Sequence, residues 1–500
     1  MHRHRLRRWP NLWFAVKPLK HVVLKMPPGD QTLTPEDPPP QPRPGGASAD
    51  VTTLLSDELI LRILAAVPDA HRLPASLVCK RWLRLVGRLC HSLTISDWSF
   101  LDRRRLRLRY PCLTDLDLVP ASFASPSSPA TGGSVLLTRG RVSVAVDTPA
   151  DSPVGECHFL EPCVIDRGLE IIAHDCPGLR KLSLVPTASE AGLMAIAGGC
   201  DTLQELELHR CSDLALRPIS GFNNLQILRL VGSVEGLYRG PGVTDFGLTI
   251  LAHGCKRLVK LELGGCEGGY DGVSAIGRCC TMLEELTISD HRMDAGWIAG
   301  LSFCRNLKTL RLQSCRRIDV DPGPLDHLGT CPTIETLQMR RCQLRDKRSL
   351  QALYMVCEAV RDVVFENCWG MDNDKFSLLS ICRRVKFLSL EGCSLLTTEG
   401  FESVVLSWPD LLRLVVVSCN NIKDDEVSPA LSSLFSVLKE LKWRPDTKSV
   451  LAVTLAGTGI RKKGGRFFKR RILQGRRQLK IVEEGIVAES SRATMLQFMV

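Results

Sequence analysis

The chain has 500 residues, of which 44% are hydrophobic and 5% aromatic, and a net charge of +11. Residues 1–25 carry seven Lys or Arg and residues 461–480 carry ten, with no acid in either segment, so the rest of the chain has a net charge of −6. A nucleic-acid-binding domain would show its basic surface on the folded domain itself, so no nucleic-acid partner is expected. No apolar run approaches the roughly 18 residues that a membrane-spanning helix needs, so no membrane span is expected either.

Residues 1–50 combine a basic N-terminus with a Pro-rich stretch, MPPGDQTLTPEDPPPQPRPGGASAD. The stretch has no apolar periodicity and predicts a disordered linker. The apolar run Leu12–Val16 is too short for a signal-peptide core. We therefore expect the nucleus and/or the cytoplasm, where the 21 cysteines are reduced thiols. A mitochondrial presequence is the alternative, which Pro10 and Pro18 disfavour.

Residues 51–97 are different in character. The segment LLSDELILRILAAVPDAHRLPASLVCKRWLRLVGRL, residues 54–89, predicts three short helices. Ser56 or Asp57 caps the first, Pro68 ends it, and the second spans about residues 71–78. Some 40 residues with this much apolar surface are too few for an independent core, so a binding partner is implied.

The blocks LSDELILRIL and SLVCKRWLRL resemble an F-box over roughly Leu54–Ile95, with Ser56 where F-boxes usually have proline. The resemblance implies binding to a Skp-type adaptor and, through it, to the cullin and RING protein of a ubiquitin ligase. The residues that it implies for the adaptor interface or its support are Leu55, Leu59, Ile60, Ile63, Leu64, Pro74, Leu77, Val78 and Trp82. Trp82 fits equally well as a filler of the seam against the first repeat.

Residues 98–164 are predicted to hold a first, weak repeat, LTDLDL at Leu113. An insertion at residues 120–156, rich in Ser, Pro, Gly and Ala, interrupts it. This composition predicts a flexible excursion.

Residues 165–443 repeat the pattern Leu-x-x-Leu-x-Leu, and all spacings but one fall within 20–29 residues. The units begin at Leu179, Leu203, Leu225, Leu258, Leu283, Leu307, Ile334, Val360, Val385, Leu411 and Leu438. A helix-like stretch precedes each strand motif, as in TDFGLTILAHGC at residues 244–255. The predicted fold class is therefore an α/β leucine-rich-repeat solenoid, a horseshoe with the strands inside. The one longer spacing hides a Gly-rich insertion, Val231–Val243, which is a recognition loop or a tolerated insertion.

Cysteines confirm this register independently, because 15 of them recur at two positions of the unit. One position lies three residues before the first apolar residue, as in Cys176, and the other lies eight after it, as in Cys211. The sequence has no C-x2-C pair, which disfavours zinc. Because free Cys is a small, easily buried hydrophobe, we expect structural thiols, no metal and no cofactor.

Strand alternation predicts which side chains face the concave surface. In the second repeat Leu206 and Leu208 point into the core. The concave residues, our candidates for contact with a protein substrate, are Glu205, Glu207, His209, Arg229, Lys260, Glu262, Arg311, Gln313, Gln338, Arg340, Asp362, Glu366 and Glu391. Their mixed charges suit a protein ligand and lack the cationic stripe that a phosphate backbone requires.

Residues 444–500 form a C-terminal tail whose basic cluster, residues 461–480, indicates a nuclear localisation signal or a solvated end. The sequence has no G-x-S-x-G, H-E-x-x-H or P-loop motif, so no catalysis is expected of the chain itself.

Taken together, the chain resembles plant F-box and leucine-rich-repeat proteins of the cysteine-containing subfamily. The resemblance implies a non-catalytic subunit of an SCF-type ubiquitin ligase that recognises an unknown protein substrate. Two alternatives stay open. One is a co-receptor for a small-molecule hormone, for which Arg311 and Arg340 would begin an anion-binding cluster. The other is an interaction scaffold without a ligase role.

Overall fold

The computed structural model describes residues 51–102, 106–124, 134–139, 142–147, 158–186, 190–233, 242–290 and 292–446. The predictions made for residues 1–50 and for the basic cluster at 461–480 lie outside the described residues. The chain divides into two compact units. The first unit consists of Met1–Leu258 with Gly264–Cys266, and the second unit consists of Val259–Leu263 with Glu267–Val500.

Thirteen short strands form one sheet in the order β1-β2-β5-β6-β7-β8-β9-β10-β11-β12-β13-β14-β15. They are β1 Ser92–Thr94, β2 Asp115–Asp117, β5 Lys181–Leu184, β6 Glu205–His209, β7 Ile227–Val231, β8 Lys260–Gly264, β9 Glu285–Ser289, β10 Thr309–Gln313, β11 Thr336–Arg340, β12 Asp362–Glu366, β13 Phe387–Glu391, β14 Arg413–Val417 and β15 Glu440–Arg444. Each predicted repeat supplies one strand, and neighbouring strands such as β10 and β11 pair in parallel. The predicted leucine-rich-repeat fold is confirmed. One strand, β1, precedes the predicted start of the array and pairs with β2 through Ser92 and Asp115.

The core forms from the same positions of successive strands. Leu206 and Leu208 are buried, as the alternation predicts, and in the second unit Leu310 lies opposite Leu337 in register. Burial of each such side chain contributes roughly 1.5–3 kcal/mol. Since a leucine on one strand packs against the leucine of the next, no repeat completes its core alone.

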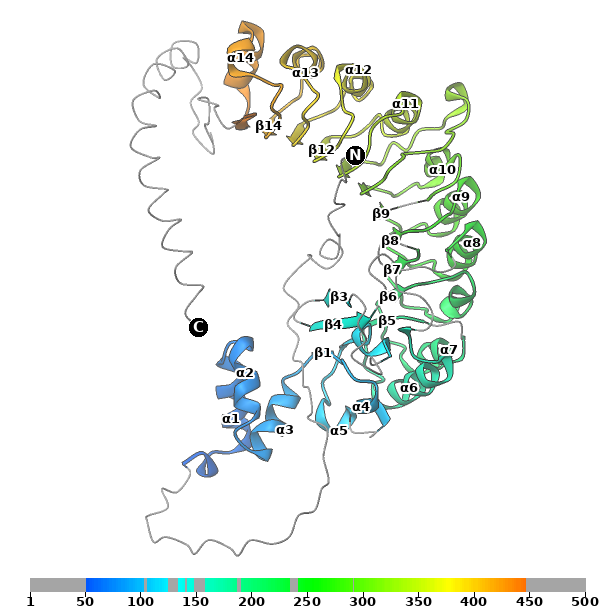
Figure 1. Ribbon diagram of the computed structural model, residues 1–500, viewed down its shortest axis with the longest axis vertical. Coiled ribbons are helices and arrows are strands. Elements are labelled where there is room, and N and C mark those ends of the chain that lie inside the picture. The colour runs from blue at the N-terminus through cyan, green and yellow to red at the C-terminus, as the bar shows by residue number, and fades with distance from the viewer. Residues whose placement is uncertain are drawn as a thin grey trace, which may run out of the picture. The chain divides into compact units, whose positions relative to one another are not determined.

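Within each unit the helices lie on one side of the strands (Figure 1). They are α4 Ser99–Asp102, α5 Leu106–Arg109, α6 Pro162–Asp175, α7 Ala191–Gly199, α8 Asp245–Gly254, α9 Tyr270–Cys279, α10 Trp297–Gly300, α11 Lys347–Val356, α12 Asn373–Ser377, α13 Thr398–Val405 and α14 Pro429–Val437. Two connections expected to be α-helical are only 3-10 helices, η4 Leu214–Gly221 and η6 Leu325–His327. Pro218 inside η4, and the Pro-Gly-Pro run of residues 322–324 before η6, account for this, because proline cannot donate an intrahelical hydrogen bond. No helix among the described residues is long and apolar enough to span a bilayer.

The three helices predicted for residues 54–89 are present as α1 Asp57–Ala66, α2 Asp69–Ser76 and α3 Lys80–Arg88, after a 3-10 turn, η1 Val51–Leu54. Ser56 caps α1, as expected, by accepting a hydrogen bond from the Leu59 N–H at 3.4 Å. Gly87 allows α3 to approach the next segment closely, since a Cβ there would lie 2.0 Å from the Arg109 carbonyl oxygen.

The expectation of a flexible excursion at residues 120–156 is wrong in part. An antiparallel hairpin, β3 Ser134–Arg139 with β4 Val142–Asp147, forms within it. Ahead of the hairpin, a 3-10 turn at Pro120–Ser122 is buried, and Phe123 pairs with Phe159, their ring centroids 4.9 Å apart. These contacts are non-local, so the Ser- and Gly-rich composition did not indicate them.

A left-handed residue follows most of the longer strands. The residues with positive φ at this position are Arg210, Gly265, Asp290, Ser314, Arg341, Asn367, Gly392 and Ser418. In this conformation the backbone N–H turns towards the next repeat, and Ser314 and Arg341 donate to the carbonyls of Arg340 and Glu366, each at 2.8 Å. The turn therefore extends the hydrogen bonding of the sheet by one residue at its carboxyl edge.

Candidate functional site

The helical segment α1–α3 has a small core of its own. Ile60, Leu64, Leu85 and Val86 are buried together, and Leu55 and Trp82 pack against them while partly exposed. Two of the predicted adaptor-contact residues, Ile60 and Leu64, are therefore supports of the segment and are not available to a partner. The indole N–H of Trp82 is buried and has no hydrogen-bond partner among the described residues.

The remaining apolar candidates are exposed. The side chains of Leu59 and Ile63 are 47% and 51% exposed and lie one turn apart on the same face of α1. Leu77 and Val78, between α2 and α3, are 75% and 64% exposed. Pro74 is exposed as well, and so is Leu54 at 83%, which the sequence prediction left out. Exposed apolar side chains gathered on so small a segment indicate a contact surface.

Two arginines missed by the sequence analysis fix this segment. Arg72 closes the end of α1 by donating to the carbonyls of Val67 at 3.0 Å and Leu64 at 3.2 Å. Arg81 donates to the Leu55 carbonyl at 2.6 Å and pairs with Asp57 at 2.7 Å, which joins α3 to the start of α1. Cationic groups near a helix C-terminus are a sequence signal for the first of these contacts.

The open face of the sheet, opposite the helices, carries all the predicted substrate-contact residues. In the first unit Glu205 lies between two cations, at 2.5 Å from Lys181 and 3.2 Å from Arg229. Arg229 also lies 3.8 Å from Glu207. These residues come from three neighbouring strands, so the charges neutralise one another across the repeats.

Glu207 and His209, predicted to face solvent, are buried, with relative exposures of 8% and 3%. They bond to each other at 2.9 Å, and Ser183 donates to Glu207 at 3.2 Å. The segment that carries Phe159 reaches this end of β6, because the guanidinium of Arg210 lies 5.2 Å from the Phe159 ring. Strand alternation predicts on which face of the sheet a side chain lies. It does not predict whether that side chain is exposed.

The second unit has a polar ladder on the same face. Arg311 donates to Glu285 at 2.7 Å and to Gln338 at 3.2 Å, and Lys260 lies 2.9 Å from Glu262 and 3.5 Å from Glu285. Partial burial by itself raises the pKa of Glu285, but Arg311 and Lys260 together outweigh this and hold its pKa below the ordinary value.

Towards the C-terminus the charges pair in the same way. Arg340 lies 3.0 Å from Glu366, and Arg413 lies 3.5 Å from Asp362. Gln313 is half-buried and Glu391 is exposed. Each arginine that the sequence analysis considered for an anion-binding cluster thus has a carboxylate of its own.

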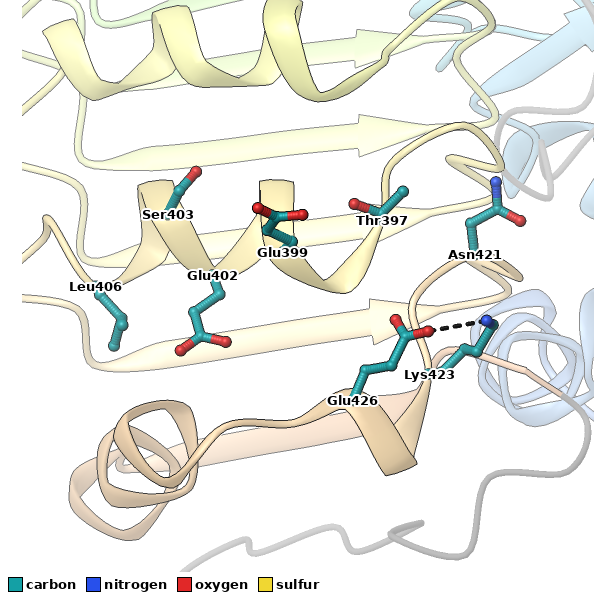
Figure 2. Close-up of a pocket in the computed structure, with 8 residues that line it drawn as sticks. All are labelled: Thr397, Glu399, Glu402, Ser403, Leu406, Asn421, Lys423 and Glu426. Carbon is teal, nitrogen blue, oxygen red and sulfur yellow. Dashed lines mark hydrogen bonds and ion pairs between the residues drawn. The ribbon is translucent and has the colours of Figure 1, made fainter.

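A shallow groove of the second unit lies between α13 and the 3-10 turn η8, Asp424–Glu426 (Figure 2). Its lining residues are Thr397, Glu399, Glu402, Ser403, Leu406, Asn421, Lys423 and Glu426. Glu426 pairs with Lys423 at 2.9 Å, and Glu402 accepts a hydrogen bond from Ser428. The groove is open and its lining side chains are largely exposed, which is unsuited to catalysis.

All 15 repeat cysteines are buried free thiols. Those ahead of the strands contact the preceding repeat, as where the Cys331 thiol lies 3.0 Å from the Cys304 carbonyl oxygen. Those after the strands contact the neighbouring strand, as where Cys368 lies 3.2 Å from the Met339 carbonyl oxygen. Burial raises the pKa of Cys200 to about 11 and that of Cys176 to about 12, so these groups are unreactive thiols. The structural role predicted for them is confirmed.

No family model matches the sequence. Part of the chain is similar to "Coronatine-insensitive protein homolog 1a" of Oryza sativa, in the indica and japonica subspecies alike, with 32% identity over 173 residues. The match covers 30% of this chain and spans only 28% of the length of these relatives.

Solved structures with a weak overall likeness include an internalin of Listeria monocytogenes, with 13% identity and a TM-score of 0.35, covering 64% of this chain and 86% of that one. Another is the Rad7 and Elc1 complex of yeast, with 12% identity and a TM-score of 0.30, covering 76% and 89%. The period of the repeats and the parallel sheet that they build establish the class on their own. The chain is a leucine-rich-repeat protein with a short helical segment ahead of its array.

Proposed function

We propose that the chain is the substrate-recognition subunit of an SCF-type ubiquitin ligase. In this proposal α1–α3 is an F-box that docks a Skp-type adaptor, and the repeats bind a protein substrate. The chain contributes no catalytic group. It raises the effective concentration of the substrate near the conjugating enzyme. The proposed place of action is the nucleus and/or the cytoplasm.

One observation carries the proposal. Leu59, Ile63, Leu77 and Val78 are large apolar side chains that the segment leaves exposed, although its own core buries Ile60 and Leu64. Helices this short cannot stabilise an open apolar surface by themselves, and a partner that covers it removes that surface from water. The F-box-like motifs LSDELILRIL and SLVCKRWLRL lie on these helices.

The repeats are proposed to bind a protein rather than a small anionic hormone. Arg229, Arg311 and Arg340 each lie within 3.2 Å of a carboxylate oxygen, so a small anion would have to displace an internal ion pair. A mixed, self-neutralised face fits a broad protein surface better.

Co-purification of the full chain with a Skp-type adaptor tests the proposal. We expect a stable complex with the wild-type chain. The double variant Leu59→Asp/Ile63→Asp should lose at least tenfold in adaptor affinity, because it places two charges in an apolar interface.

The matched control is Glu58→Ala/Arg62→Ala, which changes exposed residues of the same helix and should bind within twofold of wild type. Far-UV circular dichroism distinguishes loss of binding from loss of folding. A wild-type chain that does not bind the adaptor, or equal losses in both variants, would refute the proposal.

A further inference from the structure

The loop that follows β11 concentrates positive charge, and the loop that follows β10 adds two arginines ahead of Asp319, which is buried, and Asp321, which lies 3.6 Å from Arg348. Arg316 and Arg317 lie three and four residues after the end of β10, and the segment from the end of β11 to the start of α11 adds five cations, Arg340, Arg341, Arg345, Lys347 and Arg348. The carboxylate in this second segment is Asp346, which caps α11 by accepting from the N–H groups of Arg348 and Ser349. Both loops belong to the second unit and leave the sheet at its carboxyl edge.

Three of these cations differ from those on the open face. Arg340 pairs with Glu366, and Arg348 lies 3.6 Å from Asp321. For Arg317, Arg341 and Arg345, by contrast, no carboxylate partner is found among the described residues, and Arg317 and Arg345 are exposed. The guanidinium groups of these three arginines are therefore not neutralised by a carboxylate among the described residues.

An exposed aromatic residue lies on the loop after the neighbouring strand, β12. Trp369 follows β12 and is 49% exposed. Its backbone is fixed by the Cys342 carbonyl at 2.9 Å and by the Leu344 N–H at 2.7 Å, so the point from which the side chain projects is defined. The stem of Arg345 reaches the same loop, with its Cγ 3.5 Å from where a Cβ of Gly370 would lie. Trp and Arg are among the residues enriched at protein-binding hot spots.

The surface is short. Since neighbouring strands lie about 4.8 Å apart, the loops after β10, β11 and β12 span roughly 10 Å. Acidic residues bound it on both sides, Asp290 and Asp294 after β9 and Glu391 at the end of β13. A nucleic-acid backbone needs a longer cationic track, whereas a short segment with two or three carboxylates fits between these acidic borders.

We propose that Arg317, Arg341, Arg345 and Trp369, the loop patch, bind an acidic segment of a protein partner. Two or three carboxylates of the segment pair with the guanidinium groups, and an adjacent apolar side chain packs on the indole ring. This inference holds whether or not α1–α3 is an F-box, because it concerns the second unit alone.

Fluorescence anisotropy on the full chain tests it, with the labelled peptide (Glu-Glu-Leu)4 as the probe and (Gln-Gln-Leu)4 as the uncharged reference. The wild-type chain should bind the acidic peptide at least tenfold more tightly than the reference. Arg317→Gln/Arg341→Gln/Arg345→Gln should weaken the acidic peptide at least tenfold, and Trp369→Ala about threefold or more.

The matched control is Arg383→Gln/Arg384→Gln/Lys386→Gln, which removes the same charge from exposed residues before β13, at the opposite edge of the sheet. It should change affinity less than twofold. Equal losses of affinity in both triple variants would show that the peptide responds to the net charge of the chain and not to the loop patch, and would overturn the proposal. So would a labelled dT12 oligonucleotide that binds as tightly as the acidic peptide, since the loop patch would then be a nucleic-acid surface. Thermal melts of each variant exclude unfolding as the cause.

Discussion

Arg311 and Glu285 form an ion pair across neighbouring strands, with Nη1 of Arg311 2.7 Å from Oε2 of Glu285. Their side chains are 31% and 35% exposed, so water screens the pair only in part. We expect a double-mutant cycle with Glu285→Gln and Arg311→Met to give a coupling free energy of about 0.5–1 kcal/mol in urea unfolding.

A second pair on the same two repeats serves as its control. Lys308 lies 2.9 Å from Glu284, but these side chains are 55% and 46% exposed, so water screens the pair and the coupling should be clearly smaller than that of Arg311 with Glu285. Equal couplings would mean that burial has no part in the effect. Since the pKa of Glu285 is lowered, its contribution is present above pH 4.5 and is lost as the pH falls through the lowered value, so Glu285→Gln should flatten the acid limb of stability.

Two hydrogen bonds join Asn373 to Thr397, and we call this pair of bonds the clip. Asn373 donates to Oγ1 of Thr397 at 2.8 Å and accepts from the Thr397 N–H at 3.0 Å. In the first unit Asp213 holds Thr244 in the same way, accepting from its N–H at 2.8 Å and from its hydroxyl at 2.6 Å.

We therefore expect Asn373→Asp to change the free energy of unfolding by less than about 0.5 kcal/mol, because the Thr397 hydroxyl can reverse its role. Asn373→Ala strands the N–H and should cost about 1–3 kcal/mol. Asn421→Ala, at an exposed asparagine, is the reference for denaturant melts. A loss in the Asp variant as large as in the Ala variant would contradict the clip.

The sequence predicts the repeat well because its signals are local and recur. Leu206 and Leu208 alternate with polar residues, and Cys176 and Cys200 mark one phase of the unit, so register and fold class follow from spacing. The left-handed turn after most of the longer strands could not be predicted, since residues as unlike as Arg341 and Asn367 occupy it. Only glycines such as Gly265 signal that backbone conformation in a single sequence.

The sites were harder to predict because they depend on non-local packing. On α1, periodicity groups Leu59 with Ile60, yet one side chain is exposed and the other is core. Glu207 and His209 follow the alternation and are nevertheless buried, where they bond to each other and Glu207 accepts from Ser183. The unpaired state of Arg345 likewise depends on which carboxylates the neighbouring loops bring near.

Gly392 tests the turn after the strands. Its φ is +69°, and an added Cβ would lie 2.3 Å from Oδ1 of Asn367. Gly392→Ala should therefore cost about 1–2 kcal/mol or more in chemical denaturation, from the left-handed strain together with the contact. Gly178→Ala, where a Cβ meets nothing within 4 Å, should be neutral or stabilising by up to about 1 kcal/mol. A tolerated Gly392→Ala would show that the turn can relax.

The repeat thiols predict how stability depends on alkaline pH. Burial raises the pKa of Cys200 to about 11, whereas an unfolded thiol titrates near 8.5–9. The folded state thus retains a proton that the unfolded state releases, and the stability this provides is complete below about pH 8.5 and is lost as the pH rises towards 11. Over that window one such group accounts for about 2–3 kcal/mol. Cys200→Ala should show a shallower fall of the unfolding free energy between pH 9 and 11 than wild type, while Cys163→Ala, at an exposed thiol, should follow the wild-type slope. If all three slopes were parallel, the Cys200 thiol would have to ionise as easily in the folded chain as in the unfolded one, against its burial between repeats.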